Sequence, residues 1–134
     1  MIAAQKESID AFISLAGAGF PINQVLKYQL AEQPSFYKDY AYNVIDSLKL
    51  GIKLDAVYPP ISNILPKKLQ VFLHQWMSYD PLDEISKLSI PVLLINGSHD
   101  VQVGVDNAER LASKKMEFNL KIIEGMSHVL KDAP

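Results

Sequence analysis

The sequence contains no cysteine, no long apolar run and no block of charge of one sign. Because none of the 134 residues is Cys, disulfide frameworks, thiolate zinc sites and thiol nucleophiles are excluded. No apolar run approaches the roughly 20 residues that a membrane-spanning helix needs. The formal net charge is −2, which gives no electrostatic reason to bind nucleic acid or an anionic membrane surface. We therefore expect a soluble globular protein without these partners.

The N-terminal segment has no secretory signal, because MIAAQKESID lacks a basic region followed by an apolar core. A cytoplasmic chain is then the default expectation, which an upstream leader would overturn. The length suffices for one domain with a core. Residues 1–8 resemble the last turns of a helix that began earlier, so we expect a fragment of a larger protein.

Three apolar runs predict buried strands. They are DAFISLAG at 10–17, PVLLIN at 91–96 and NLKIIEG at 119–125. A helix is expected at 105–115, between the second and third runs. Strands joined through helices predict a parallel sheet, so the expected fold class is α/β with about three parallel strands.

The segment between the first two strands is expected to be helical. Pro21 suits the first turn of one helix, and further helices are expected at 35–50 and 67–78. The last of these carries an apolar face made of Leu69, Phe72, Leu73, Trp76 and Met77. Some sixty residues are too many for a simple crossover. We therefore expect residues 20–80 to form a helical cap on a core made of 1–19 and 81–134.

Polar side chains with catalytic chemistry follow the last two predicted strands. Asp100 comes shortly after one strand and His128 after the next, 28 positions apart in the chain. The carboxyl ends of parallel strands meet at one edge of a sheet, where ligands and catalytic groups gather. A carboxylate there can fix the tautomer of an imidazole and stabilise its protonated form, so that the imidazole acts as a general base.

The segments GSHDVQV and IIEGMSHVL, each after a strand, resemble the C-terminal half of the α/β-hydrolase fold. FISLAGAGF similarly resembles the strand before the cap in that family, and the esterase or lysophospholipase-like hydrolases are the branch that it resembles most. The resemblance implies that Asp100 is the acid and His128 the base of a Ser–Asp–His triad. It also implies a small-molecule ester or related acyl substrate, and no cofactor.

The nucleophile of such a triad is missing from the sequence. No G-x-S-x-G occurs, and neither Ser98 nor Ser127 has the flanking glycines of a nucleophile elbow. The resemblance implies that the serine and the oxyanion-hole loop lie upstream of Met1. We expect the isolated chain to be inactive, and an exposed sheet edge to make it self-associate as a homodimer.

Simpler interpretations of the two residues stay open. Asp100 could be a turn former in its G-S-H-D loop, and His128 could cap a following helix. A metal site is disfavoured, because His99-Asp100 lacks ligand spacing and no H-x-x-x-H occurs. A dinucleotide site at AGAGF is disfavoured too, since position 22, where a third Gly is required, is Ile.

Phe72 and Trp76 can be interpreted in two ways. Such a helix face is more often core than pocket, but in a cap it would roof the active site and favour an acyl or aromatic substrate group. We therefore keep both residues as candidate substrate-binding residues. The alternative function is a non-catalytic α/β module whose helices bind a hydrophobic ligand or a partner protein.

Overall fold

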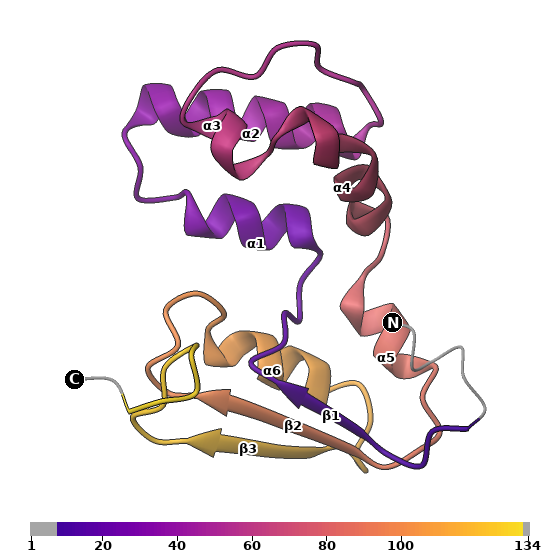
Figure 1. Cartoon of the computed structure of the whole chain (residues 1–134). Helices are drawn as coiled ribbons and strands as arrows, with labels where there is room; N and C mark the ends of the chain where they lie inside the picture. The colour runs from indigo at the N-terminus through magenta and orange to yellow at the C-terminus, as the bar shows by residue number, and fades with distance from the viewer. Residues whose placement is uncertain (1–7, 133–134) are drawn as a thin grey trace. The chain divides into compact units, whose positions relative to one another are not determined.

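The structure, a computed structural model, describes residues 8–132 and divides the chain into two compact units. The first, the sheet unit, contains the described residues up to Phe20 and from Asp80 onward, and the second, the helical unit, spans Pro21–Tyr79. Figure 1 shows the elements of each. Each unit is described by itself below. The expected tail of an upstream helix falls almost entirely on residues 1–7, outside the described part.

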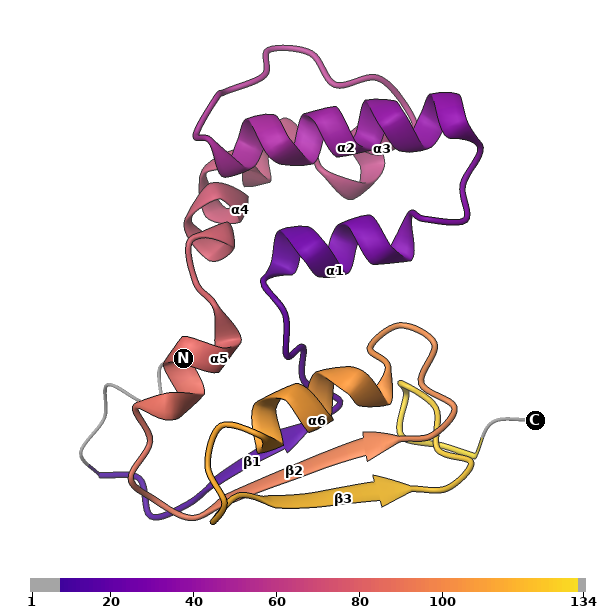
Figure 2. The same ribbon diagram turned by 180° about the vertical axis from the view of Figure 1, so that it is seen from behind.

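The sheet unit contains three parallel strands in the order β1-β2-β3: β1 (Phe12–Leu15), β2 (Val92–Gly97) and β3 (Asn119–Ile123). All three arrows point the same way (Figure 2). In the register, Phe12 pairs with Val92 and Leu93 with Asn119. The expectation of an α/β fold with three parallel strands is confirmed. Each strand lies within or one residue beyond its predicted range.

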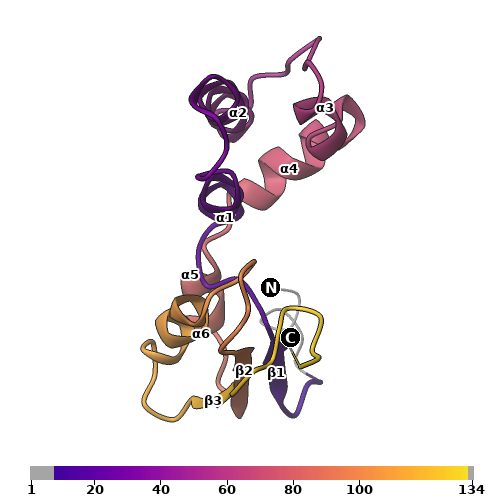
Figure 3. The same cartoon turned by 90° about the vertical axis from the view of Figure 1, so that its left-hand side faces the viewer.

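One face of this sheet is packed against helices. Helix α5 (Pro81–Ser86) precedes β2, and α6 (Val105–Ala112) connects β2 to β3, with α6 beside the sheet when the strands are seen nearly end-on (Figure 3). The core between helices and strands consists of Ile85, Leu88, Val92, Leu94, Leu111 and Phe118, with Phe12, Ile90 and Ala112 at its margin. Burial of this apolar area is the main force that holds the unit together.

The opposite face of the sheet is apolar but open in the described residues. Ile13 is 58% exposed, Leu15 53% and Ile123 38%. The parallel register puts these side chains on one face with Leu93 and Ile95, which are only half-buried. Side chains alternate between the two faces of a strand, so the continuous apolar runs of β1 and β2 produce this second apolar face.

Side chains of helix α6 also bind the two chain segments, at Gly19 and Asp80, that lead into and out of the helical unit. The Asn107 side chain accepts a hydrogen bond from Gly19 N at 2.9 Å. The Arg110 guanidinium donates to the Gly19 carbonyl, and to both oxygens of Asp80 at 3.1 and 3.2 Å. It also lies over the Phe20 ring, 4.8 Å from its centre. Arg110 thereby lowers the pKa of Asp80, chiefly through the hydrogen bond to the charged carboxylate.

The helical unit contains α1 (Ile22–Gln29), α2 (Ser35–Lys49), α3 (Ile61–Ile64), a 3₁₀ turn (Lys67–Leu69) and α4 (Gln70–Met77). Its core consists of Leu30, Ala41, Val44, Ile45, Leu48, Ile61, Leu65, Leu73 and Met77. The helices expected after Pro21, at 35–50 and at 67–78 are thus present. No helix among residues 8–132 is both long and apolar enough to cross a membrane.

The apolar face of α4 is only partly buried. Of its five apolar residues, Leu73 and Met77 are buried, whereas Phe72 and Trp76 are 54% and 46% exposed. Gln70 is also buried on this helix. Its side chain accepts a hydrogen bond from Leu54 N at 3.0 Å and donates one to Leu54 O at 2.9 Å. A polar residue that satisfies a distant backbone segment cannot be recognised from helical periodicity.

Candidate active site

The loop after β2 holds the Asp100 carboxylate in a fixed orientation. Asp100 is buried, and its Oδ1 accepts backbone hydrogen bonds from Gln102 at 3.0 Å and Val103 at 2.8 Å. This is the local turn geometry that Asp favours. The interpretation of Asp100 as a turn former therefore holds for one of its two oxygens.

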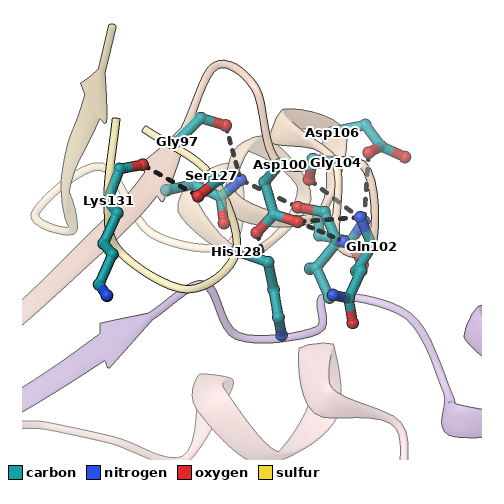
Figure 4. A network of polar contacts seen from close by, with 11 residues as sticks. Gly97, Asp100, Gln102, Gly104, Asp106, Ser127, His128 and Lys131 are labelled. Carbon is teal, nitrogen blue, oxygen red and sulfur yellow. Dashed lines mark hydrogen bonds and ion pairs between the residues drawn. The ribbon is translucent and has the colours of Figure 1, made fainter. Parts of the chain in front are cut away.

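The loop after β3 closes upon itself and carries His128. Its start is Gly125, whose φ of +73° lies in the left-handed region that glycine tolerates best. Both the backbone N–H and the hydroxyl of Ser127 donate to the Lys131 carbonyl, at 2.8 and 2.9 Å (Figure 4). Met126 and Asp132 form an isolated antiparallel bridge. His128 thus lies in a tight loop rather than at the start of a helix in the described residues.

The two loops are joined by hydrogen bonds. Ser98 N donates to the Ile123 carbonyl at 3.0 Å, and His99 N donates to the Met126 carbonyl at 3.1 Å. In return, Gly125 N donates to the Ser98 hydroxyl oxygen at 2.9 Å. These bonds fix the position of one loop relative to the other without involving the two candidate side chains.

Gly97 allows the close approach of these loops. A Cβ at this position would lie 1.8 Å from the Met126 carbonyl oxygen and 2.5 Å from its carbon. Any side chain would therefore push the loop after β3 away from β2. The requirement at Gly97 is space rather than an unusual backbone angle.

The loops bring Asp100 and His128 into direct contact. The Oδ2 atom of Asp100 lies 2.9 Å from Nδ1 of His128 (Figure 4). The carboxylate side chain is 0% exposed and the imidazole 34%. Since the carboxylate can only accept, a neutral ring here carries its proton on Nδ1 and leaves the lone pair of Nε2 free. A neutral ring in that tautomer can accept a proton through Nε2.

The hydroxyl groups of the two serines near the site form hydrogen bonds with backbone groups. The hydroxyl of Ser98 accepts from Gly125 N, and that of Ser127 donates to Lys131 O. Neither is bonded to His128 in the described part of the chain. His99 is exposed, and no three His, Asp or Glu side chains within residues 8–132 come together as metal ligands would.

The candidate substrate-binding residues lie in the helical unit. The Phe72 and Trp76 rings contact each other with their centres 5.5 Å apart and are about half exposed on α4. They form an apolar surface there instead of joining the core of that unit.

Sequence reasoning missed Asn96. This residue is 0% exposed, and its side-chain Nδ2 donates to the Val103 carbonyl at 3.0 Å, within the loop that carries Asp100. The signal for it was present, since Val92, Leu94 and Asn96 alternate on the buried face of β2. A polar residue in such a series needs a hydrogen-bonding partner.

Several solved structures are similar to this chain in fold. An α/β-fold family hydrolase from Bacillus anthracis str. Sterne is 15% identical, with a TM-score of 0.57. A meta-cleavage product hydrolase from Pseudomonas fluorescens IP01, crystallised as a serine-to-alanine mutant with acetates, is 18% identical with a TM-score of 0.52. BpoC from Mycobacterium tuberculosis H37Rv, a candidate non-heme bromoperoxidase, is 16% identical with a TM-score of 0.51.

These matches cover nearly all of this chain but only part of the other proteins. The matched share is 92–95% of this chain and 52–55% of theirs, so the chain spans about half the length of these solved structures. No protein-family model matches the sequence, and neither does any curated protein. The chain therefore has part of the α/β-hydrolase fold, as the sequence resemblance predicted.

Proposed function

We propose that the chain supplies the acid and the base of a serine hydrolase that acts on carboxylic esters or related acyl bonds. The observation that supports this most directly is the 2.9 Å contact between Asp100 Oδ2 and His128 Nδ1. It lies after neighbouring parallel strands, where catalytic groups of α/β folds gather, in a fold that it shares with solved hydrolases.

In the proposed reaction His128 moves the protons. Its Nε2 takes the proton of a serine hydroxyl while the serine oxygen attacks the ester carbonyl, and the imidazolium then protonates the departing alkoxide. A water molecule releases the acyl group by the reverse transfer. Asp100 stays ionised throughout, holds the productive tautomer and stabilises the positive charge on the ring.

The serine would come from a segment upstream of this chain. Ser98 and Ser127 are bonded to backbone groups, no G-x-S-x-G occurs, and the chain spans about half the length of the hydrolases it matches. The isolated chain would then lack both the nucleophile and the oxyanion donors. We propose that it is inactive alone and forms part of a complete enzyme.

The helical unit would act as a cap and bind the substrate. Its bounds in the structure, Pro21–Tyr79, lie close to the cap expected at 20–80, and the half-exposed Phe72 and Trp76 offer apolar surface. An acyl chain or an aromatic group matches such a surface. These two residues therefore stay our candidates for substrate binding.

The isolated chain would also self-associate, as a homodimer. Within the described residues β1 is an edge strand paired only with β2, and its Ile13 and Leu15 are more than half exposed. An unpaired, apolar edge is a template for pairing with another chain. Antiparallel pairing of two β1 edges would satisfy both copies through the same surface.

A non-catalytic binding module remains the alternative function. It is favoured by the same exposed apolar surfaces, on β1 and on α4, which would then bind a hydrophobic ligand or a partner protein. Under this alternative the Asp100–His128 contact would serve only the loop structure.

Hydrolysis of p-nitrophenyl esters by a protein extended upstream of Met1 separates the two functions. His128→Gln should lower kcat by roughly 10⁶-fold, the order seen when the histidine of a triad is lost. His99→Gln is the matched control, since His99 is an exposed histidine of the same loop pair, and should change kcat less than about twofold. Absence of ester hydrolysis in the extended protein itself would favour the binding module, and full activity in the His128 variant would contradict the role proposed for His128.

A further inference from the structure

Asn96 is a buried polar residue for which the proposed reaction gives no role. It is the penultimate residue of β2 and is fully buried on the face that packs against α6. Its Nδ2 lies 3.0 Å from the Val103 carbonyl and 3.4 Å from the Gly97 carbonyl. The Val103 contact spans seven positions in the chain and closes the loop that holds Asp100.

The amide is costly to keep at this position. Within the described residues no hydrogen bond reaches Asn96 Oδ1, although the atom is buried. A buried polar atom without a partner opposes folding, whereas an apolar side chain of similar shape would carry no such penalty. The preceding inward residues of β2, Val92 and Leu94, are apolar. Simple packing therefore does not explain an amide here.

The bond to Val103 connects Asn96 to the catalytic pair. Asn96 Nδ2 holds the Val103 carbonyl, and the N–H of the same residue donates to Asp100 Oδ1 at 2.8 Å. The other carboxylate oxygen, Oδ2, meets His128 Nδ1 at 2.9 Å. A continuous series of hydrogen bonds thus runs from the sheet core to the imidazole (the loop and the pair appear in Figure 4).

We propose that Asn96 is a positioning residue for the Asp100–His128 pair. Its amide fixes Val103, so that Asp100 Oδ1 stays bound to the loop backbone and Oδ2 stays directed at His128. The description of the pair as catalytic rests on the proposed function, but the positioning itself can be measured in this chain alone.

The test follows the ring nitrogens of His128 by ¹⁵N NMR in the 134-residue chain, at a pH at which the ring is neutral. Asn96→Leu replaces the amide with an apolar group of the same branched shape, although a larger one. Leu94→Ala is the matched control, because Leu94 is equally buried on the same face of β2 but makes no bond to the loop. Thermal unfolding of each variant measures the purely structural effect.

In the unaltered chain we expect one tautomer of His128, with the proton on Nδ1. In Asn96→Leu the Nε2–H form should appear beside it, and protection of the Val103 amide from hydrogen exchange should fall by about tenfold, the loss expected for a removed hydrogen bond. In Leu94→Ala the ring should keep its single tautomer despite a lower Tm.

An unchanged His128 tautomer and an unchanged Val103 amide in Asn96→Leu would overturn the proposal. If that variant does not fold, Asn96→Ser, which shortens the side chain without filling the site, is measured in the same way and decided by the same criteria. These measurements do not depend on any catalytic activity of the chain. A failure here therefore leaves the proposed hydrolase function standing, and a failure of the ester test leaves the positioning result standing.

Discussion

Asp100 uses its two carboxylate oxygens for different partners: Oδ1 accepts the backbone N–H groups of Gln102 and Val103, whereas Oδ2 lies 2.9 Å from His128 Nδ1. The same side chain therefore builds its own loop and orients the imidazole. This division leads to a sharp expectation for the amide variant.

Asp100→Asn should fold but lose the productive tautomer. The two N–H groups of the loop require an acceptor, so the amide oxygen should take the place of Oδ1 and the amide nitrogen should face His128. That nitrogen donates, which forces the proton of the ring onto Nε2. In the complete enzyme we expect kcat to fall by about 10⁴-fold, and ¹⁵N NMR of this chain should show the Nε2–H form. Retention of the Nδ1–H form would contradict this orientation of the carboxylate.

Gly97→Ala should destabilise the sheet unit by separating the two loops. The added Cβ would meet the Met126 carbonyl at 1.8 Å, and overpacking against backbone costs about 1–3 kcal/mol or more. Urea unfolding measures the change. Gly125→Ala is the matched control: its Cβ meets no atom within 4 Å, but its φ is +73°, so only about 1–2 kcal/mol of backbone strain is expected. Equal His128 spectra in both variants would show that loop contact does not set the site.

Arg110→Gln should lower stability in a pH-dependent manner. Arg110 holds the pKa of Asp80 below its ordinary value of 3.8, so the pair stabilises the fold above that pH, and this stabilisation is lost as the pH falls through the depressed pKa of the folded state. We expect a loss of about 1 kcal/mol at neutral pH for this partly exposed pair.

The difference between Arg110→Gln and the unaltered chain should then shrink in acid. It should not vanish, because Arg110 also donates to the Gly19 carbonyl and lies over Phe20. Denaturant unfolding at several pH values measures both effects. A difference that stays constant or grows as the pH falls would show that the Asp80 charge contributes nothing.

Ile13→Lys should prevent self-association of the isolated chain. Ile13 is 58% exposed on the edge strand β1, and a charge placed there opposes pairing with a second sheet. Light scattering coupled to gel filtration measures the mass over a range of concentrations. Met116→Lys adds the same charge at a fully exposed apolar residue outside the strands, and should leave the association unchanged. A monomer in the unaltered chain at all concentrations would rule out the proposed dimer.

Much of the fold could be predicted from the sequence because its signals are local. Apolar runs that end at glycine or asparagine indicated β1, β2 and β3, and an apolar face at helical spacing indicated α4. The meeting of Asp100 and His128 followed from geometry alone, since adjacent parallel strands end at the same edge of a sheet. Their catalytic roles stay a prediction.

What could not be predicted depends on contacts between distant segments. Gln70 is buried because it bonds to the backbone of Leu54, and position 97 needs glycine because the carbonyl of Met126 lies against it. Periodicity counts apolar residues and cannot show which polar residue finds a partner. The same limit hid Asn96, and it left open whether Phe72 and Trp76 lie in the core or on an exposed surface of their helix.

Covalent labelling with a fluorophosphonate, read by intact mass, tests the central claim most directly. It compares the 134-residue chain, a protein extended upstream through the expected nucleophile elbow, and the His128→Ala variant of that longer protein. We predict one added label in the extended protein and none in the other two, because only an activated serine reacts. Labelling of the 134-residue chain, or undiminished labelling without His128, would contradict the assignment of this chain as the acid–base half of a serine hydrolase.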